Sequence, residues 1–483
     1  MSFLGIDLGT SGLRALLVSA EGIPIGSSER HYNVSHPNLG WSEQDPADWI
    51  TAFESVISEL KNTYYEFNNL KGIGVAGHMH GATLLDSSGS VLRPCILWND
   101  IRSQAEAKRL DATDQVRSLS GNIVFPGFTA PKLEWVRKNE PEIFNKIAKV
   151  LLPAAYMNFY LTGDYVADMS DSAGTSWLDV GKRNWSDYLL DVSNMRRDQM
   201  PRLVEGSEAA GELRLEIKSK WGLSGKITVA GGAGDNAAAA CGIGALGEGQ
   251  GFVSIGTSGV ILSSRDGYEP APETAVHTFC HAVPGRWYQM GVMLSATDSL
   301  NWLAGITLKS PSELTSSIGD KLLRPGNVRF LPYLSGERTP HNDAEIQGSI
   351  TGISANTSVD DLTRGVLEGV AFGLKDCFDA LSATNAKMGQ LTAIGGGTAS
   401  IYWMRLLATI LEVPLNLPEG GEFGAALGAA RLGMAASVDK PLEKIIIPPI
   451  IRETIDPDTS MQSVFCEAHI KYKAAYPSIK SIQ

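Results

Sequence analysis

Short apolar stretches alternate with polar turns at the start of the chain. Residues 3–7, 13–18 and 22–28 are largely apolar, and the turns GTSG and Glu21-Gly22 separate them. Apolar runs of this length, bounded by Gly and Ser, are typical of β-strands. The pattern therefore predicts a three-stranded antiparallel meander.

A helix and another strand are predicted next. Asp45-Pro46 has the residues of an N-cap and a first helical position, so a helix is expected to run to about residue 67. The run GIGVAG at 72–77 predicts a strand after it. Strands joined through a helix in this order indicate an α/β fold with a right-handed crossover.

The second half of the chain repeats the pattern. Residues 251–261 predict a hairpin, and 391–394 predict a strand that ends in three glycines before a helix at 400–411. The GTSG turn also recurs at 256–259, about 250 residues after its first copy. A chain of 483 residues exceeds one usual hydrophobic core. We therefore predict two α/β domains, 1–245 and 246–483.

The composition excludes several classes of protein. With 43% hydrophobic and 19% charged residues, the chain is typical of globular proteins. A formal charge of −12 argues against a nucleic-acid partner. No apolar run is long enough to span a membrane, and the five scattered cysteines suggest neither disulfides nor a zinc site. A cytoplasmic location is the default expectation.

The two GTSG turns suggest a way to hold a polyphosphate. Turns rich in Gly, Thr and Ser direct several backbone N–H groups into one concavity, which suits phosphate oxygens. Asp7 precedes the first turn, whereas Ser254 occupies the matching place before the second. A carboxylate beside phosphates is a ligand that Mg²⁺ accepts, so Asp7 is the candidate metal ligand.

Asp235 is the candidate for proton chemistry. It follows the glycine-rich segment GGAG and precedes four alanines and a predicted helix. At a helix start the carboxylate is either a plain N-cap or a base placed to take a proton from a hydroxyl nucleophile. This segment alone leaves both interpretations open.

Other motifs are weak. The Walker pattern GxxxxGK[ST] is absent, and the GxGxxG match at 242–247 follows a helical stretch instead of a strand, which argues against a dinucleotide site. The histidines at 78 and 80, and at 277 and 281, lack the setting of a metal site. We interpret His80 as a hydrogen-bonding group at a strand end, where α/β proteins tend to bind ligands.

The order of these segments resembles the FGGY carbohydrate kinases, in the superfamily of actin, hexokinase and the heat-shock chaperone ATPases. The resemblance covers nearly the whole chain. The segments that carry it are GIDLGTSGLRALL, WSEQDP, GHMHGATLLD, ILWND, GFTAPKLEWV, DMSDSAGTSWLDV, GGAGDNAA, SIGTSG, FLPYLSGERTPHN, AIGGG and GAALGAARL. MHGATLLD and ERTPHN resemble the branch of the family that acts on xylulose.

The resemblance implies a fold, a reaction and a set of site residues. It implies two actin/hexokinase-like (ribonuclease H-like) domains with a nucleotide and sugar cleft between them. The reaction would be ATP- and Mg²⁺-dependent phosphorylation of D-xylulose on its terminal hydroxyl, with Asp235 as the base and Asp7 at the metal. The implied residues for the sugar are Met79, His80, Trp98, Asp235 and Asn236, and those for the nucleotide are Thr10, Ser11, Gly256, Thr257, Gly395, Gly396 and Gly397.

Three positions depart from the family pattern, and two other functions stay open. His78 stands where relatives that act on xylulose usually have Gln, Gly365 where Ala or Ser is usual, and Arg14 where Lys is commoner. One alternative function is a kinase for another ketopentose, a deoxypentulose or a polyol. The other is a non-enzymatic, actin-like ATP switch. The resemblance also suggests a homodimer.

Overall fold

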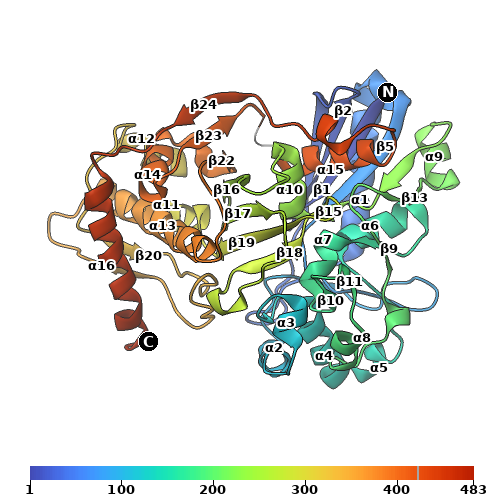
Figure 1. The fold of residues 1–483 in the computed structure, drawn as a ribbon, viewed down its shortest axis with the longest axis horizontal. Helices are drawn as coiled ribbons and strands as arrows, with labels where there is room; N and C mark the ends of the chain where they lie inside the picture. Colours follow the sequence, from blue (N-terminus) through green and yellow to red (C-terminus); the bar gives the residue numbers. More distant parts are fainter. Residues whose placement is uncertain (421–423) are drawn as a thin grey trace.

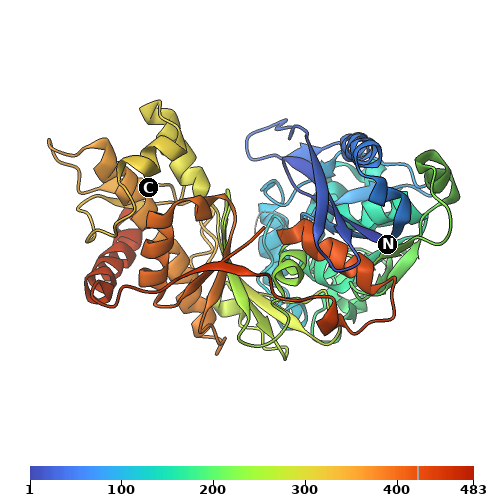
Figure 2. The same ribbon diagram turned by 90° about the horizontal axis from the view of Figure 1, so that it is seen from above.

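The computed structural model describes residues 1–420 and 424–483, and it has two seven-stranded sheets that lie in separate lobes (Figures 1 and 2). The first sheet contains β1 (Ser2–Leu8), β2 (Gly12–Ser19), β3 (Pro24–His31), β5 (Leu70–Gly77), β13 (Ala209–Glu212), β14 (Thr228–Ala230) and β15 (Ala233–Gly234). The second contains β16 (Gly251–Ile255), β17 (Gly259–Arg265), β18 (His277–Cys280), β19 (Trp287–Met293), β22 (Leu391–Ile394), β23 (Leu415–Pro418) and β24 (Ile451–Ile455).

Helices cover both sheets. In the first half they are α1 (Pro46–Thr63), α2 (Gln104–Asp111), α3 (Val116–Ser120), α4 (Thr129–Asn139), α5 (Pro141–Phe144), α6 (Pro153–Thr162), α7 (Met169–Ser172), α8 (Asp187–Asp191), α9 (Leu215–Trp221) and α10 (Asp235–Ile243). In the second half they are α11 (Thr297–Thr307), α12 (Pro311–Ser317), α13 (Val359–Ser382), α14 (Ile401–Leu411), α15 (Gly424–Ala435) and α16 (Gln462–Lys480).

Short strand pairs complete the fold. They are β4 (Glu43–Gln44) with β7 (Cys95–Ile96), β6 (Thr83–Leu85) with β8 (Lys149–Leu151), β9 (Val166–Asp168) with β12 (Arg202–Val204), β10 (Leu178–Asp179) with β11 (Asn184–Trp185), and β20 (Arg329–Leu331) with β21 (Ser349–Thr351).

The two sheets share one plan. β1, β2 and β3 form an antiparallel meander, and β5 pairs with β1 in parallel. In the second sheet β16, β17 and β19 form the meander, and β22 pairs with β16 in parallel. The predicted α/β fold with two actin/hexokinase-like (ribonuclease H-like) lobes is confirmed. Each GTSG turn joins the first two strands of its meander.

Helix α1 shows where the sequence prediction was accurate and where it was not. Asp45 is the N-cap, and its carboxylate accepts a hydrogen bond from the N–H of Ala47. The helix ends at Thr63, earlier than residue 67, because Tyr64 is extended and a short 3-10 helix covers Tyr65–Asn69. The Tyr64 ring lies over Gly26 of β3, where a Cβ would meet its atoms at 2.0 Å. A tertiary contact thus overrides the local helical pattern.

Helix α15 crosses between the halves. It belongs to the second half of the chain, yet it packs against α10, β1 and β5 of the first lobe (Figures 1 and 2). A Cβ at Gly5 would lie 1.9 Å from the carbonyl oxygen of Ala426, and one at Gly428 would lie 1.7 Å from that of Ala238. Glycines therefore allow backbone contact between these elements. The division at residue 245 stays a prediction.

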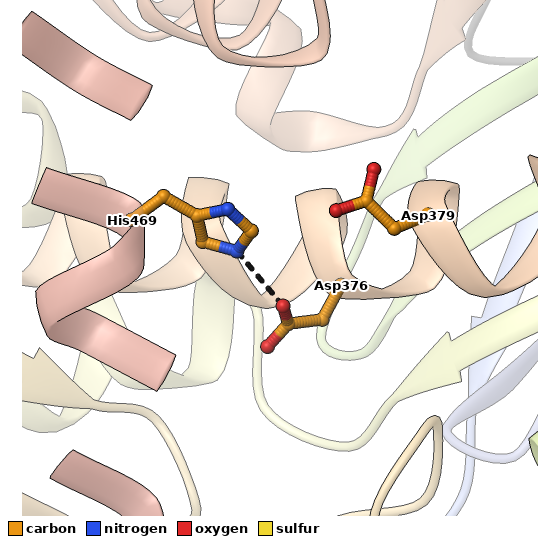
Figure 3. Close-up of side chains that lie close together, drawn as sticks. All are labelled: Asp376, Asp379 and His469. Atoms are coloured by element: carbon orange, nitrogen blue, oxygen red, sulfur yellow. Dashed lines mark hydrogen bonds and ion pairs between the residues drawn. The ribbon is translucent and has the colours of Figure 1, made fainter. Parts of the chain in front are cut away.

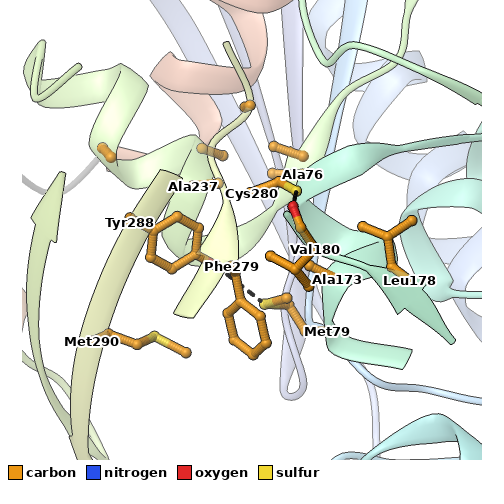
Figure 4. Close-up of a cluster of buried hydrophobic side chains, with 14 of the residues drawn as sticks. Ala76, Met79, Ala173, Leu178, Val180, Ala237, Phe279, Cys280, Tyr288 and Met290 are labelled. Carbon is orange, nitrogen blue, oxygen red and sulfur yellow. Dashed lines mark hydrogen bonds between the residues drawn. The ribbon is translucent and has the colours of Figure 1, made fainter. Parts of the chain in front are cut away.

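An apolar cluster joins the lobes beside the cleft. Met79, from the segment after β5, packs with Tyr288 and Met290 of β19 and with Phe279 of β18 (Figure 4). The Tyr288 hydroxyl donates to Met79 Sδ at 3.7 Å. The two halves therefore share a core close to the residues predicted to bind sugar.

A buried hydrogen bond between His469 and Asp376 links helix α16 to helix α13. His469 Nε2 lies 2.8 Å from Asp376 Oδ1, and Asp379 is one turn further along α13 (Figure 3). Lys375 Nζ donates to Asp379 at 2.7 Å.

Gly365, also on α13, permits close packing of the helix, because a Cβ there would lie 2.7 Å from Val328 Cγ1. In the described ranges, no helix has the length and apolar character needed to cross a membrane.

Candidate active site

Asp235 is the first residue of α10. Gly234, and not Asp235, occupies the cap position. The Asp235 carboxylate accepts hydrogen bonds from the backbone N–H of Asn236 at 2.7 Å and from its side-chain amide at 2.9 Å. The plain N-cap interpretation is therefore wrong for this residue, and its carboxylate is available to the cleft.

The segment DMSDS fixes the start of α10. Asp168 Oδ2 accepts from the hydroxyl of Ser170 at 2.5 Å, and that hydroxyl oxygen accepts from the N–H of Gly234 at 3.1 Å. Gly234 also lies against Met79, since a Cβ there would be 2.8 Å from Met79 Cγ. These contacts bring Asp235 beside the segment that follows β5.

A cavity of about 1100 Å³ lies along the cleft between the lobes. Its walls come from the first turn, α10, the second turn and the glycine turn after β22. The predicted site residues that line it are Asp7, Asp235, Asn236, Gly256, Thr257, Gly395 and Gly396. Gly395 has a φ of 91°, a left-handed conformation that favours glycine. The structure thus brings both turns and both carboxylates to one space.

Three residues predicted to contact the nucleotide do not line this cavity. The Thr10 hydroxyl oxygen accepts from Trp98 Nε1 at 2.9 Å, and the Ser11 carbonyl accepts from the N–H of Tyr32 at 3.3 Å. Gly397 packs against Ile255, with 2.4 Å from a built Cβ to Ile255 Cγ2. Their contact with a nucleotide stays a prediction.

A smaller pocket opens on the other side of Asp235. All five residues predicted to bind sugar line it: Met79, His80, Trp98, Asp235 and Asn236. Asp235 and Asn236 line both spaces. The carboxylate therefore stands where the larger cavity and the smaller pocket meet.

The electrostatics of the cleft suit a base and a cation. Burial raises the pKa of Asp235 to about 6, although the hydrogen bonds from Asn236 oppose the shift. Burial and the charge of Asp235 raise the pKa of Asp7 to about 7, whereas Arg14 lowers it. Two carboxylates in one cavity oppose each other's ionisation, and a divalent cation at Asp7 would relieve that repulsion.

His80 presents one ring nitrogen to the smaller pocket. Its Nδ1 lies 2.7 Å from the carbonyl oxygen of Gly174. A carbonyl only accepts, so Nδ1 carries the proton and Nε2 is left as an acceptor. Burial lowers the pKa of His80 well below its ordinary value, which keeps the ring neutral. The ring also stacks on Phe128, with 4.5 Å between centroids.

His78, the departure from the family pattern, does not line the smaller pocket. β5 ends at Gly77, and the ring of His78 packs edge-on against Trp49 at 5.6 Å. Burial lowers its pKa to about 3, so it is neutral. The place of His78 in the core argues against a direct contact between this residue and a ligand in the smaller pocket.

Arg338 is a pocket residue that sequence reasoning missed. It lines the smaller pocket from the second half of the chain, together with Ser258 and Met290. Its guanidinium carbon lies 5.1 Å from the centre of the Phe125 ring. Burial lowers the pKa of Arg338 to about 10, so it stays charged near neutral pH. Arg338 belongs to the ERTPHN segment, whose resemblance to the xylulose branch of the family could have indicated its place in the pocket.

Comparison with known protein families agrees with this geometry. The family model for the N-terminal domain of the FGGY family of carbohydrate kinases matches residues 2–242, and that for the C-terminal domain matches residues 251–437. The chain belongs to the FGGY family of carbohydrate kinases. The resemblance inferred from the sequence motifs is confirmed.

Individual relatives cover nearly the whole chain. It is 44% identical to a xylulose kinase from Escherichia coli (strain K12) over 482 residues, which is 99% of each chain. It is 45% identical to a xylulose kinase from Klebsiella pneumoniae over 450 residues, 93% of this chain and 92% of that one. The crystal structure of a "xyloylose kinase" from Brucella ovis superposes with a TM-score of 0.96 at 52% identity, with 100% of both chains covered.

Proposed function

We propose that this carbohydrate kinase transfers the γ-phosphoryl group of ATP to the terminal hydroxyl of D-xylulose, giving D-xylulose 5-phosphate and ADP. The observation that carries the proposal is the position of Asp235, whose carboxylate lines both the large cavity and the smaller pocket. The names of the relatives support xylulose as the sugar. A cytoplasmic location is part of the proposal, because ATP is the phosphoryl donor.

The large cavity is the proposed site of ATP. Its size, its two Gly- and Thr-containing turns and the glycines after β22 suit a nucleotide with its phosphates. Asp7 would hold Mg²⁺ there, since its carboxylate faces the same cavity as Asp235. When bound, Mg²⁺ neutralises charge on the phosphates.

The smaller pocket is the proposed site of the sugar. His80 offers Nε2 as an acceptor for a sugar hydroxyl, and Asn236 and Arg338 offer donors. A terminal hydroxyl beside Asp235 would point toward the large cavity. Asp235 then accepts the hydroxyl proton as the oxygen attacks the γ-phosphorus, which is worth about 10²–10⁴-fold in rate. Most of the remaining acceleration comes from positioning and charge neutralisation.

The test is sugar-dependent release of ADP from Mg-ATP with D-xylulose, D-ribulose, L-xylulose, L-ribulose and glycerol. We expect a strong preference for D-xylulose. The Asp235→Asn variant should bind the sugar yet turn over about 10²–10⁴-fold more slowly. Near-normal turnover in that variant would remove Asp235 from its role as base, and preference for another sugar would change the substrate and leave the kinase reaction intact.

The two alternative functions have distinct signatures. A kinase for another ketopentose, a deoxypentulose or a polyol would release ADP with a different sugar. An actin-like switch would hydrolyse ATP without sugar and form filaments, and a lined sugar pocket next to Asp235 argues against it. The predicted homodimer is also part of the proposal, and light scattering of the purified protein tests it.

A further inference from the structure

Lys132 is buried next to His80, a residue that lines the smaller pocket. Its side chain is fully buried, and among the described residues no carboxylate forms an ion pair with it. Its Nζ donates instead to the backbone carbonyl of His80 at 2.8 Å. Buried lysines are rare unless their charge is paired. The hydrogen bond from Lys132 to the His80 carbonyl is therefore an unusual feature of the core.

The start of α4 holds His80 from several sides. Thr129 and Lys132 are three positions apart on α4, so their side chains project from one face of the helix. The Thr129 hydroxyl donates to the same His80 carbonyl at 3.1 Å. Phe128, the residue before the helix, stacks on the imidazole. The carbonyl and the ring of His80 are thus fixed by one short segment.

The conformation of His80 requires such support. Its φ is 69°, in the left-handed region that residues with a Cβ adopt rarely. Gly174 completes the arrangement, because a Cβ there would lie 2.5 Å from His80 Nδ1. If the His80 backbone relaxed from this conformation, its Cα–Cβ bond would be reoriented and the imidazole would move away from the carbonyl oxygen of Gly174.

We propose that Lys132, assisted by Thr129, is a positioning residue for the sugar site. Its Nζ, a hydrogen-bond donor in either protonation state, holds the His80 carbonyl so that the imidazole keeps Nε2 directed into the pocket as an acceptor. This inference rests on the proposed function, in which His80 binds the sugar. Lys132 itself does not line the pocket, so we expect it to make no direct contact with the substrate.

The first test compares Lys132→Met with Lys149→Met. Lys149 is the control, because it is a partly buried lysine whose Nζ also donates to backbone carbonyls, those of Asp198 and Met200, and it lines neither the large cavity nor the smaller pocket. Loss of the Lys132 hydrogen bond should raise the KM for the sugar about 10- to 100-fold, while the KM for ATP stays within about threefold. Lys149→Met should leave both constants unchanged. Equal losses for sugar and ATP in Lys132→Met would overturn the proposal.

The second test does not depend on which sugar is phosphorylated. Nitrogen NMR of histidine-labelled protein reports the ring tautomer of His80, assigned by its loss in His80→Asn. We expect the Nδ1–H tautomer in the wild type and a mixture of tautomers in Lys132→Met. An unchanged His80 signal would overturn the proposal, whereas failure of D-xylulose as a substrate would affect only the proposed function.

A milder variant covers the case in which Lys132→Met does not fold. Thr129→Val removes one of the two donors to the His80 carbonyl and nearly preserves the side-chain volume. It should move the sugar KM and the His80 signal in the same direction, by about 3- to 10-fold for KM. In the His80→Asn background Thr129→Val should no longer weaken sugar binding, because the partner ring is gone. A loss that persists there would contradict the proposal.

Discussion

The carboxylates of Asp7 and Asp235 line the same cavity, and the charge of Asp235 contributes to raising the pKa of Asp7 to about 7. Asp7 lies on β1 and Asp235 begins α10, so two different elements supply the pair. Ionisation of both carboxylates at once is therefore unfavourable.

The pH dependence of turnover should report Asp235. A base must be ionised, and the pKa of Asp235 is raised to about 6. Activity should therefore be constant above pH 7 and fall about tenfold per unit well below pH 6. Initial rates at saturating Mg-ATP from pH 5 to 9 measure this. The residual rate of Asp235→Asn should lack the inflection, and wild-type activity that is flat down to pH 5 would contradict the assignment.

The substitution Asp7→Asn should separate stability from activity. The raised pKa of Asp7, about 7 against 3.8, means that ionising this group destabilises the folded state progressively as pH rises from about 4 to 7. At pH 8 without Mg²⁺, Asp7→Asn should raise the melting temperature by roughly 2–8 °C, and the gain should vanish near pH 4.

The same variant should lose activity and its response to Mg²⁺. Turnover should fall by about 10²-fold or more, because the proposed metal ligand is gone. Calorimetric scans with and without Mg²⁺, beside the exposed control Asp456→Asn, measure the stability effects. A lower melting temperature for Asp7→Asn at pH 8 would show that the charge is not destabilising.

Local patterns predicted much of this protein, and long-range contacts account for the rest. The meanders, the two turns and the start of α10 were predictable because each depends on residues close together in sequence. The packing of α15 on the first lobe was not, since Gly428 meets Ala238 from a distant part of the chain. The contact of Lys132 with His80 was hidden for the same reason, whereas the ERTPHN segment contained a signal for Arg338 that was not used.

One substitution should have opposite effects in two helices. A Cβ at Gly428 in α15 would lie 1.7 Å from the carbonyl oxygen of Ala238, whereas one at Gly305 in α11 would meet nothing within 4 Å. Gly428→Ala should lower the free energy of unfolding by about 3 kcal/mol or more, since backbone must move. Gly305→Ala should raise it by about 0.5–1 kcal/mol through helix propensity. Urea unfolding measures both, and equal effects would contradict the close packing of α15.

Arg338 should determine affinity for the sugar from the second half of the chain. Arg338 is a charged side chain that lines the smaller pocket. It belongs to the C-terminal half of the chain, whereas Met79 and His80, which line the same pocket, belong to the N-terminal half. Removing its donors in Arg338→Met should raise the KM for the sugar about 10- to 100-fold and change the KM for ATP by less than about threefold. Arg338→Lys keeps the charge but loses the planar fork, so its KM for the sugar should lie between those of Arg338→Met and the wild type.

Arg286→Met, at an exposed ion pair with Asp266, is the control and should behave as the wild type. Steady-state kinetics with each substrate varied in turn decide the matter, and a sugar KM in Arg338→Met equal to that of the control would exclude Arg338 from sugar recognition.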